Sequence, residues 1–167
     1  MVCQKLDIIA AMFEQKLYAI CHNIRSLHNV GSIFRTADAA GVDKIFLCGY
    51  TGQPPRKEIS KVSLGAEESV PWEHHYQTWR VVENLKSLHV QIVALENNIG
   101  FYSQNFQEFK PRFPTALLIG NEVTGLSEGL LKRADSVVSI PMFGQKESLN
   151  VSVAFGIALF ELNRHRR

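Results

Sequence analysis

The sequence lacks the segments that would direct a protein into or across a membrane. No apolar run reaches the roughly 18 residues that a transmembrane helix needs. The N-terminus also has neither the long apolar core nor the small-residue cleavage site of a secretory signal. Cys3, Cys21 and Cys48 are an odd number without metal-ligand spacing, so we expect no disulfide framework and buried free thiols at Cys21 and Cys48. These absences predict a cytoplasmic protein.

Several common catalytic motifs are missing as well. There is no G-x-G-x-x-G sequence after a strand and no Walker A loop, which disfavours nicotinamide chemistry and nucleotide hydrolysis. Gly125-Leu-Ser-Glu-Gly129 fits the G-x-S-x-G pattern of α/β-hydrolases, but we find no persuasive Ser-His-Asp arrangement to accompany it. The six histidines show no H-x-x-x-H spacing, so we expect no metal site.

The chain has little net charge, and its basic residues are unevenly distributed. The formal charge is +2, with 20% charged and 46% hydrophobic residues, as in ordinary soluble proteins. Arg56, Lys57 and Lys61 nevertheless lie close together, and residues 164–167 are basic. Such patches can supply the electrostatic part of RNA binding, although on charge alone solvated surface segments explain them equally well.

The order of apolar and polar segments indicates one α/β domain over residues 1–167. Short apolar runs typical of strands lie at residues 17–21, 44–50, 90–95, 116–119 and 137–140. Helical patterns alternate with them, at residues 31–40, 78–89, 126–134 and 149–164. This alternation predicts a mostly parallel sheet flanked by helices.

Two segments outside this alternation are assigned by composition. Residues 1–17 are expected to form a short N-terminal helical extension, with the helix over residues 7–16. Residues 51–70 contain glycine, two prolines and several charges, which favours a long functional loop with one helical turn.

The first of three polar junctions follows the first predicted strand. Asn29 lies where a helix N-cap is expected, and capping alone would explain it. Arg35 lies on an otherwise apolar helix, so its charge must reach water, an acid or a ligand phosphate. Asp38, three residues later, could simply pair with Arg35.

The second junction leaves the predicted strand at residues 116–119. Gly120 and Gly125 would let the backbone pass close to a ligand or adopt positive φ. Glu122 between them is an acid near the end of a buried strand, which is costly unless the carboxylate is hydrogen-bonded. The alternative is an ordinary turn with Glu122 in solvent.

The third junction precedes the last helix, where Ser148 and Asn150 follow a strand and a glycine-containing turn. Helix capping is the default explanation for both residues. However, the three polar junctions each follow a separate strand, and the carboxyl ends of parallel strands are where open α/β sheets bind ligands. We therefore expect their polar groups to converge on one rim.

The residues at these junctions resemble the three motifs of the SpoU family, the TrmH-like branch of the SPOUT RNA methyltransferases. They occur in the family order, and the similarity extends from about Tyr18 to the end of the chain. The motifs are Asn29-Val-Gly-Ser-Ile-Phe-Arg-Thr-Ala-Asp-Ala-Ala-Gly41, Leu118-Ile-Gly-Asn-Glu-Val-Thr-Gly-Leu-Ser127 and Ile140-Pro-Met-Phe-Gly-Gln-Lys-Glu-Ser-Leu-Asn-Val-Ser152.

The resemblance implies an α/β fold with a C-terminal trefoil knot, S-adenosyl-L-methionine bound in the knot, and a homodimer acting on tRNA or rRNA. The last helix suits a dimer, because it is apolar nearly all round. We expect Phe155 on the face that meets the second copy.

The resemblance also implies residue roles. The cofactor would be held by the backbone around Leu95, Gly120, Ile140 and Leu149, with Ser148 as a further contact. Arg35 would activate a ribose 2′-hydroxyl, either as a base or electrostatically. The residues positioning Arg35 and the ribose would be Asn29, Glu122, Ser148 and Asn150.

The expected function is therefore S-adenosylmethionine-dependent methylation of a ribose 2′-hydroxyl in RNA. Two alternatives stay open at this point. One is a non-catalytic RNA-binding protein that keeps the knot, and the other is a methyltransferase that modifies a base, as in more distant SPOUT branches.

Overall fold

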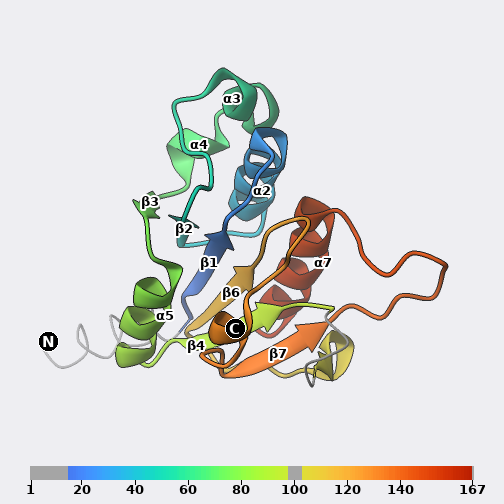
Figure 1. Ribbon diagram of the computed structural model, residues 1–167. Helices are drawn as coiled ribbons and strands as arrows, with labels where there is room; N and C mark the ends of the chain where they lie inside the picture. Colours follow the sequence, from blue (N-terminus) through green and yellow to red (C-terminus); the bar gives the residue numbers. More distant parts are fainter. Residues whose placement is uncertain (1–14, 98–102, 167) are drawn as a thin grey trace, which may run out of the picture.

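The computed structural model describes residues 15–97 and 103–166, which form a seven-stranded sheet between two layers of helices (Figure 1). The strand order is β3-β2-β1-β6-β4-β7-β5, and every neighbouring pair is parallel. The strands are β1 (Leu17–His22), β2 (Lys44–Cys48), β3 (Trp72–His75), β4 (Gln91–Leu95), β5 (Gln104–Asn105), β6 (Thr115–Ile119) and β7 (Ser136–Ser139). The predicted α/β architecture is confirmed.

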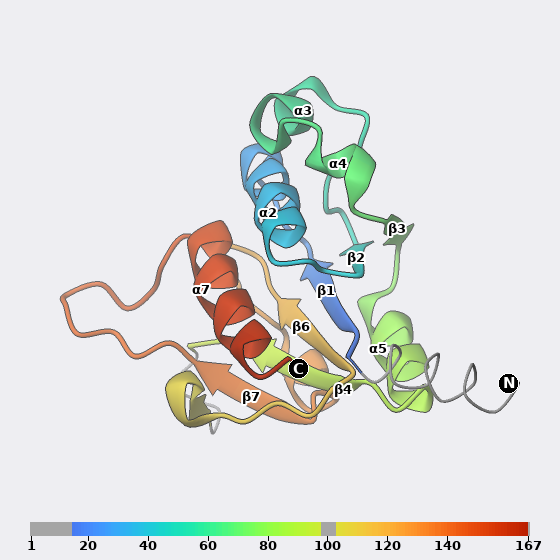
Figure 2. The ribbon, with the colours of Figure 1, turned by 180° about the vertical axis from the view of Figure 1, so that it is seen from behind.

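Alternate residues of the strands contribute to two separate cores. In β6, Leu117 and Ile119 face the core under α2 (Leu27–Ala39) and α7 (Val151–Arg164), whereas Ala116 and Leu118 face the core under α5 (Thr78–Ser87) and α6 (Glu128–Leu131). Figure 2 shows α2 and α7 in front of the strands. All five β6 residues are buried, as expected for a central parallel strand covered on both faces.

Helix α2 begins four residues earlier than predicted, and Asn29 is not its N-cap. The Ser26 hydroxyl caps the helix by accepting a hydrogen bond from Asn29 N at 3.3 Å. Asn29 therefore lies in the first helical turn, and its side chain is free to bond elsewhere. The helix ends near Gly41, whose φ of 66° is in the left-handed region.

The prediction of a long loop over residues 51–70 was wrong. This segment contains two short helices, α3 (Lys57–Ser63) and α4 (Ala66–Ser69), before β3. Helix α3 packs directly on α2 at Gly31, where a Cβ atom would lie 2.7 Å from Ile59 O. Buried Ile59 and Ala66 anchor the two helices, but so few apolar positions give no clear period in the sequence.

Helix α7 buries one face and exposes another. Phe155, Ala158, Leu159 and Leu162 lie in the core, and Phe155 is fully buried. The prediction that Phe155 faces a second copy was therefore wrong. The exposed apolar residues of α7 are Val153, Ile157 and Phe160, which share one helical face.

The β7–α7 connection, residues 140–150, projects from the body of the molecule (Figure 1). The helix predicted over residues 7–16 and the N-terminal extension fall almost entirely outside the described residues. The trefoil knot stays a prediction of the family resemblance. In residues 15–97 and 103–166, no helix is both long enough and apolar enough to cross a membrane.

Candidate cofactor pocket and active site

A pocket lies where the carboxyl ends of β4, β6 and β7 meet the start of α7. Its volume is about 200 Å³. The lining residues come from four segments: Leu95, Glu96, Asn97, Ile119, Gly120, Asn121, Glu122, Val123, Gly125, Ile140, Ser148, Leu149, Val151 and Ala154. This is the edge of an open parallel sheet at which ligands commonly bind.

All five residues expected to contact the cofactor line this pocket. Leu95 and Gly120 are buried, Ile140 is half-buried, and Ser148 and Leu149 are exposed on the rim. The fold thus brings together three segments that are far apart in the sequence. Their role in binding a cofactor stays a prediction.

The turn after β6 is built on two glycines. A Cβ atom on Gly120 would lie 2.6 Å from the Gly125 carbonyl carbon, so only glycine lets the turn close this tightly. Gly125 has a φ of 63°, and a Cβ atom there would overlap the Glu96 carboxylate. That carboxylate accepts a hydrogen bond from Leu126 N at 2.7 Å, which holds the turn against β4.

Asn97 fixes the segment that follows β7. Its side-chain nitrogen donates to Ile140 O at 3.1 Å, and its side-chain oxygen accepts from Ile140 N at 3.2 Å. Glu96 and Asn97 were not among the predicted site residues. The available signal was two polar residues directly after the predicted strand at residues 90–95.

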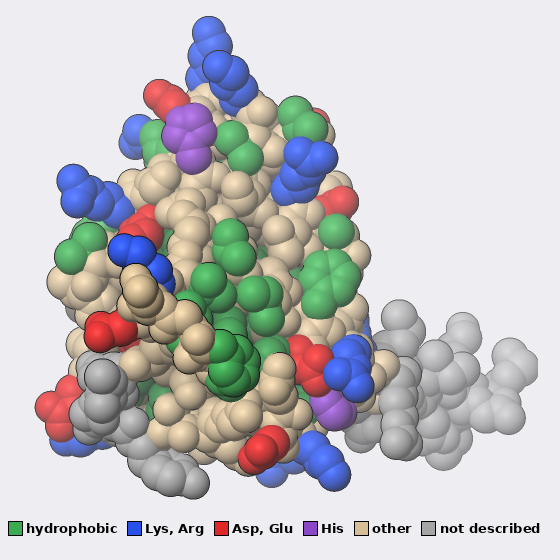
Figure 3. Space-filling model, turned by 90° about the vertical axis from the view of Figure 1, so that its right-hand side faces the viewer, with side chains coloured by type: hydrophobic (Ala, Val, Ile, Leu, Met, Phe, Trp, Pro, Cys, Tyr) green, Lys and Arg blue, Asp and Glu red, His purple; other side chains and the backbone are tan. Residues whose placement is uncertain are grey.

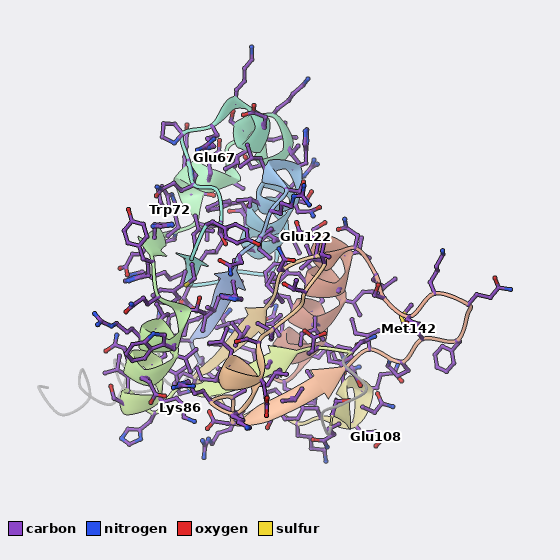
Figure 4. All side chains as sticks on the ribbon, in the orientation of Figure 1. Glu67, Trp72, Lys86, Glu108, Glu122 and Met142 are labelled. Atoms are coloured by element: carbon purple, nitrogen blue, oxygen red, sulfur yellow. The ribbon has the colours of Figure 1, made fainter. Side chains whose placement is uncertain are left out.

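A chain of side-chain hydrogen bonds links the three motifs beside the pocket. Asn150 Nδ2 donates to Asn29 Oδ1 at 3.1 Å, and Asn29 Nδ2 donates to Glu122 Oε1 at 2.9 Å. Asn150 also caps α7, since its side-chain oxygen accepts from Ser152 N. Figure 4 shows Glu122 in the region between α2 and the start of α7. Three of the five residues expected in catalysis are therefore in direct contact.

Glu122 is exposed in a turn, as the alternative had it, but its carboxylate is held by hydrogen bonds. It accepts hydrogen bonds from Arg25 N at 2.9 Å and Ser26 N at 3.0 Å, besides the one from Asn29. Burial alone would raise the pKa of Glu122, but these hydrogen bonds outweigh that effect and hold the pKa below its usual value of 4.5. Glu122 therefore contributes a fixed negative charge beside the pocket.

Arg35 and Ser148 lie apart from this chain. Arg35 is exposed on α2 and does not line the pocket, and no residue in the described ranges forms an ion pair or hydrogen bond with its side chain. The suggested pairing with Asp38 was wrong, because Asp38 instead accepts a hydrogen bond from Ser69. Ser148 lies at the pocket rim and does not cap α7.

Asn121 is a buried pocket residue that sequence reasoning missed. Its oxygen accepts hydrogen bonds from Val123 N and Thr124 N, both at 2.9 Å. Its nitrogen donates to Asn23 O at 2.9 Å and to the Tyr50 hydroxyl at 2.8 Å. Asn121 thus ties the β6 turn to the segments that follow β1 and β2, and its position between Gly120 and Glu122 was the available signal.

Residues 16–160 match the SpoU rRNA Methylase family. Over 161 residues the chain is 33% identical to the 23S rRNA (guanosine-2'-O-)-methyltransferase RlmB of Vibrio parahaemolyticus. The matched region covers 96% of this chain and 64% of the relative. It is 34% identical over 154 residues to the tRNA (guanosine(18)-2'-O)-methyltransferase of Aquifex aeolicus, covering 92% of this chain and 71% of the relative. The chain thus spans less than two thirds of the Vibrio relative.

Solved structures show the same likeness. The AdoMet-bound rRNA methyltransferase from Sinorhizobium meliloti superposes with a TM-score of 0.79 at 34% identity, covering 91% of this chain and 57% of that one. The A. aeolicus TrmH/SpoU tRNA modifying enzyme superposes with a TM-score of 0.81 at 32% identity, covering 98% of this chain and 83% of that one. Together with the sequence match and the converging motifs, these likenesses establish that the chain belongs to the SpoU rRNA methylase family.

Proposed function

We propose that this protein is an S-adenosyl-L-methionine-dependent RNA methyltransferase that modifies a ribose 2′-hydroxyl of tRNA or rRNA. The observation that carries the proposal is the convergence of the three motifs on one pocket, with the chain Asn150–Asn29–Glu122 at its edge. The relatives named as rRNA and tRNA 2′-O-methyltransferases support this reaction.

The pocket suits the chemistry of the cofactor. Apolar side chains of Leu95, Ile119 and Ile140 can cover an adenine ring, and nearby backbone groups can bond its edge. The Glu96 and Glu122 carboxylates also line the pocket, and they suit a ligand that carries a sulfonium and an amino group. Because about 200 Å³ is small, an elongated ligand would extend along the exposed rim at Ser148 and Leu149.

When bound, the cofactor supplies an electrophilic methyl group, and the protein must present a sugar hydroxyl in line with it. The Arg35 guanidinium can neutralise the negative charge that develops on the ribose oxygen while it holds an RNA phosphate. The amide groups of Asn29 and Asn150 are oriented by their mutual hydrogen bond and by Glu122, so they are arranged to position the ribose.

A homodimer is part of the proposal. Val153, Ile157 and Phe160 are each between 43% and 50% exposed on one face of α7. Apolar side chains gather at the centre of the molecular face in Figure 3. A second copy would cover such a surface, as symmetric dimers commonly do. Helix α2 packs against α7, with Thr36 beside Gly156, so a second copy on α7 would lie close to Arg35.

RNA contact is proposed at the basic end of the molecule formed by α3. Arg56, Lys57 and Lys61 are exposed there, and Lys and Arg side chains project from this end in Figure 3. The basic C-terminal segment is less available, because Arg166 donates to Gly41 O at 2.6 Å and to Asp43 at 2.9 Å. Buried free thiols at Cys21 and Cys48 suit the reducing cytoplasm in which we propose the enzyme acts.

Methyl transfer from radiolabelled S-adenosylmethionine to separated tRNA and rRNA, taken from a host lacking the gene, tests the proposal. Ribose methylation blocks the hydroxyl that nucleases use, so the label should appear in a nuclease-resistant dinucleotide. Label on a base would favour the base-modifying alternative. Cofactor or RNA binding without any transfer would favour a non-catalytic RNA-binding protein.

A further inference from the structure

A second pocket lies on the other side of Asn23 from the candidate active site. Its volume is about 440 Å³, within the range of about 300–1,000 Å³ usual for small-molecule sites. It is formed by the ends of β1 and β2, the start of α5 and the first turn of α6. The lining residues are His22, Asn23, Gly49, Tyr76, Gln77, Thr78, Trp79, Ser127, Gly129, Leu130 and Arg133. None of their side chains was assigned a role above.

Two exposed aromatic side chains line this pocket. Tyr76 is 87% exposed and Trp79 is 43% exposed. Both rings contact a neighbouring side chain. His74 packs edge-on against Tyr76 with ring centroids 5.2 Å apart, and the Arg80 guanidinium lies 5.2 Å from the Trp79 ring centroid. His74 is itself held, since its Nε2 donates to Gly49 O at 3.0 Å. Pre-oriented aromatic faces in solvent are surfaces on which a flat ring can stack.

The polar floor of the pocket is uncharged. His22 Nε2 lies 3.1 Å from Asn23 Nδ2, which can only donate, so Nε2 accepts and the ring proton lies on Nδ1. Nδ1 lies 2.6 Å from Thr78 Oγ1. Burial also lowers the pKa of His22, which favours the neutral ring. A neutral floor of this kind suits a neutral heterocycle better than a charged side chain.

Positive charge lies at the pocket margin. Arg133 lines the pocket, but it donates to Gly129 O at 2.6 Å and its charge is paired with Glu83, 3.3 Å from Nε. Arg80 adds a second cation beside Trp79. Cations next to stacking surfaces are the arrangement that binds single-stranded nucleic acid.

The pocket is joined to the candidate active site by one side chain. Asn121 lines the cofactor pocket, and its nitrogen donates to the carbonyl of Asn23, which lines the second pocket. The two cavities therefore lie at the same edge of the sheet, on either side of the Asn121–Asn23 hydrogen bond.

We infer that the second pocket binds an unpaired nucleobase of the RNA substrate, from a nucleotide that flanks the methylated one. The base stacks on Tyr76 and Trp79, and Arg80 neutralises the adjoining phosphate. This inference rests on the proposed function, because it takes RNA as the ligand. It also implies that the target region is single-stranded, since a paired base cannot enter the pocket.

The test measures binding of a single-stranded RNA oligonucleotide that carries 2-aminopurine, whose fluorescence falls when its ring stacks. Wild-type protein should quench the fluorescence and bind the single strand more tightly than a duplex of the same length. Tyr76→Ala and Trp79→Ala should each weaken binding about 5- to 150-fold and reduce the quenching, because base stacking contributes roughly 1–3 kcal/mol per base.

Three matched variants serve as controls. Tyr76→Phe and Trp79→Phe keep an aromatic face and should retain most of the affinity. Leu88→Ala removes an exposed apolar side chain at the opposite end of α5 and should change nothing. S-adenosylmethionine affinity and thermal unfolding should be unaltered in every variant.

The inference is overturned if wild type does not bind the oligonucleotide, or if the alanine variants bind and quench as wild type does. It is also overturned if a peptide or protein, rather than RNA, competes for the aromatic surface. The proposed function has a separate readout, because wild-type methyl transfer to cellular RNA is measured independently. Methylation without dependence on Tyr76 and Trp79 removes only the pocket, whereas oligonucleotide binding without methyl transfer removes only the reaction.

Discussion

Asn29 and Glu122, which are 93 positions apart in the sequence, meet through a hydrogen bond of 2.9 Å from Asn29 Nδ2 to Glu122 Oε1. The same carboxylate accepts two backbone N–H groups just before α2. Glu122 therefore links the turn after β6 to the start of α2. Its negative charge also interacts favourably with the positive, N-terminal end of that helix. Glu122 therefore both stabilises the fold and supplies a negative charge at the candidate active site.

Replacing this carboxylate gives a pH-dependent prediction. Glu122→Gln keeps the shape but places an amide nitrogen opposite hydrogen-bond donors, so we expect a loss of about 1 kcal/mol in unfolding free energy at neutral pH. The pKa of Glu122 is lowered in the folded state, so its contribution is present above the usual value of 4.5 and is lost as pH falls through the folded value. Urea unfolding across pH should show wild type and variant converging in acid. A constant difference at every pH would contradict this account.

Arg35→Ala should lower methyl transfer about 100-fold or more, because the positive charge at the ribose oxygen is lost. S-adenosylmethionine affinity and thermal unfolding should be retained, since Arg35 is exposed and does not line the cofactor pocket. Activity assays paired with calorimetry check this. Loss of cofactor binding as complete as the loss of activity would rule out a role on the hydroxyl, and Arg35→Lys should recover part of the activity if charge is what matters.

Gly125→Ala should destabilise the protein by about 1–3 kcal/mol and abolish cofactor binding. Its φ of 63° disfavours alanine, and the new Cβ atom would displace the Glu96 carboxylate from Leu126 N. Gly144→Ala is the matched control in the neighbouring connection, because a Cβ atom there meets nothing within 4 Å. Thermal unfolding and calorimetry should separate the two variants, and equal behaviour would exclude the Gly125 turn as a determinant of the site.

Ile157→Asp should convert the proposed dimer into a folded monomer, because it would bury an unpaired charge at the interface. Phe155→Asp should instead unfold the protein, since Phe155 lies in the core and loss of a buried Phe already costs about 3–5 kcal/mol. Size-exclusion chromatography with light scattering and circular dichroism distinguish these results. A stable Ile157→Asp dimer would remove this face of α7 from the interface.

Local patterns in the sequence were sufficient for five of the seven strands and for helices α2, α5, α6 and α7, whereas β3, β5 and the strand order were not predicted. Short apolar runs ending at Cys21, Leu95 and Ile119 predicted the strands, because a parallel strand buried on both faces must be apolar throughout. Polar residues and glycines that follow the strands ending at Cys21, Ile119 and Ile140 predicted one ligand-binding rim. The five cofactor contacts, which the family resemblance implied, all line one pocket.

Only the tertiary structure decided which polar residue bonds to which. Asn29 resembled a helix cap but bonds Glu122, Arg166 resembled a free RNA contact but is bonded to Asp43, and Glu96 and Asn97 hold turns that are distant in sequence. Tertiary packing likewise buried Phe155 while leaving Ile157 exposed on the same apolar helix. Backbone patterns depend on neighbours a few residues away, whereas these contacts depend on which strand ends are brought together when the sheet forms.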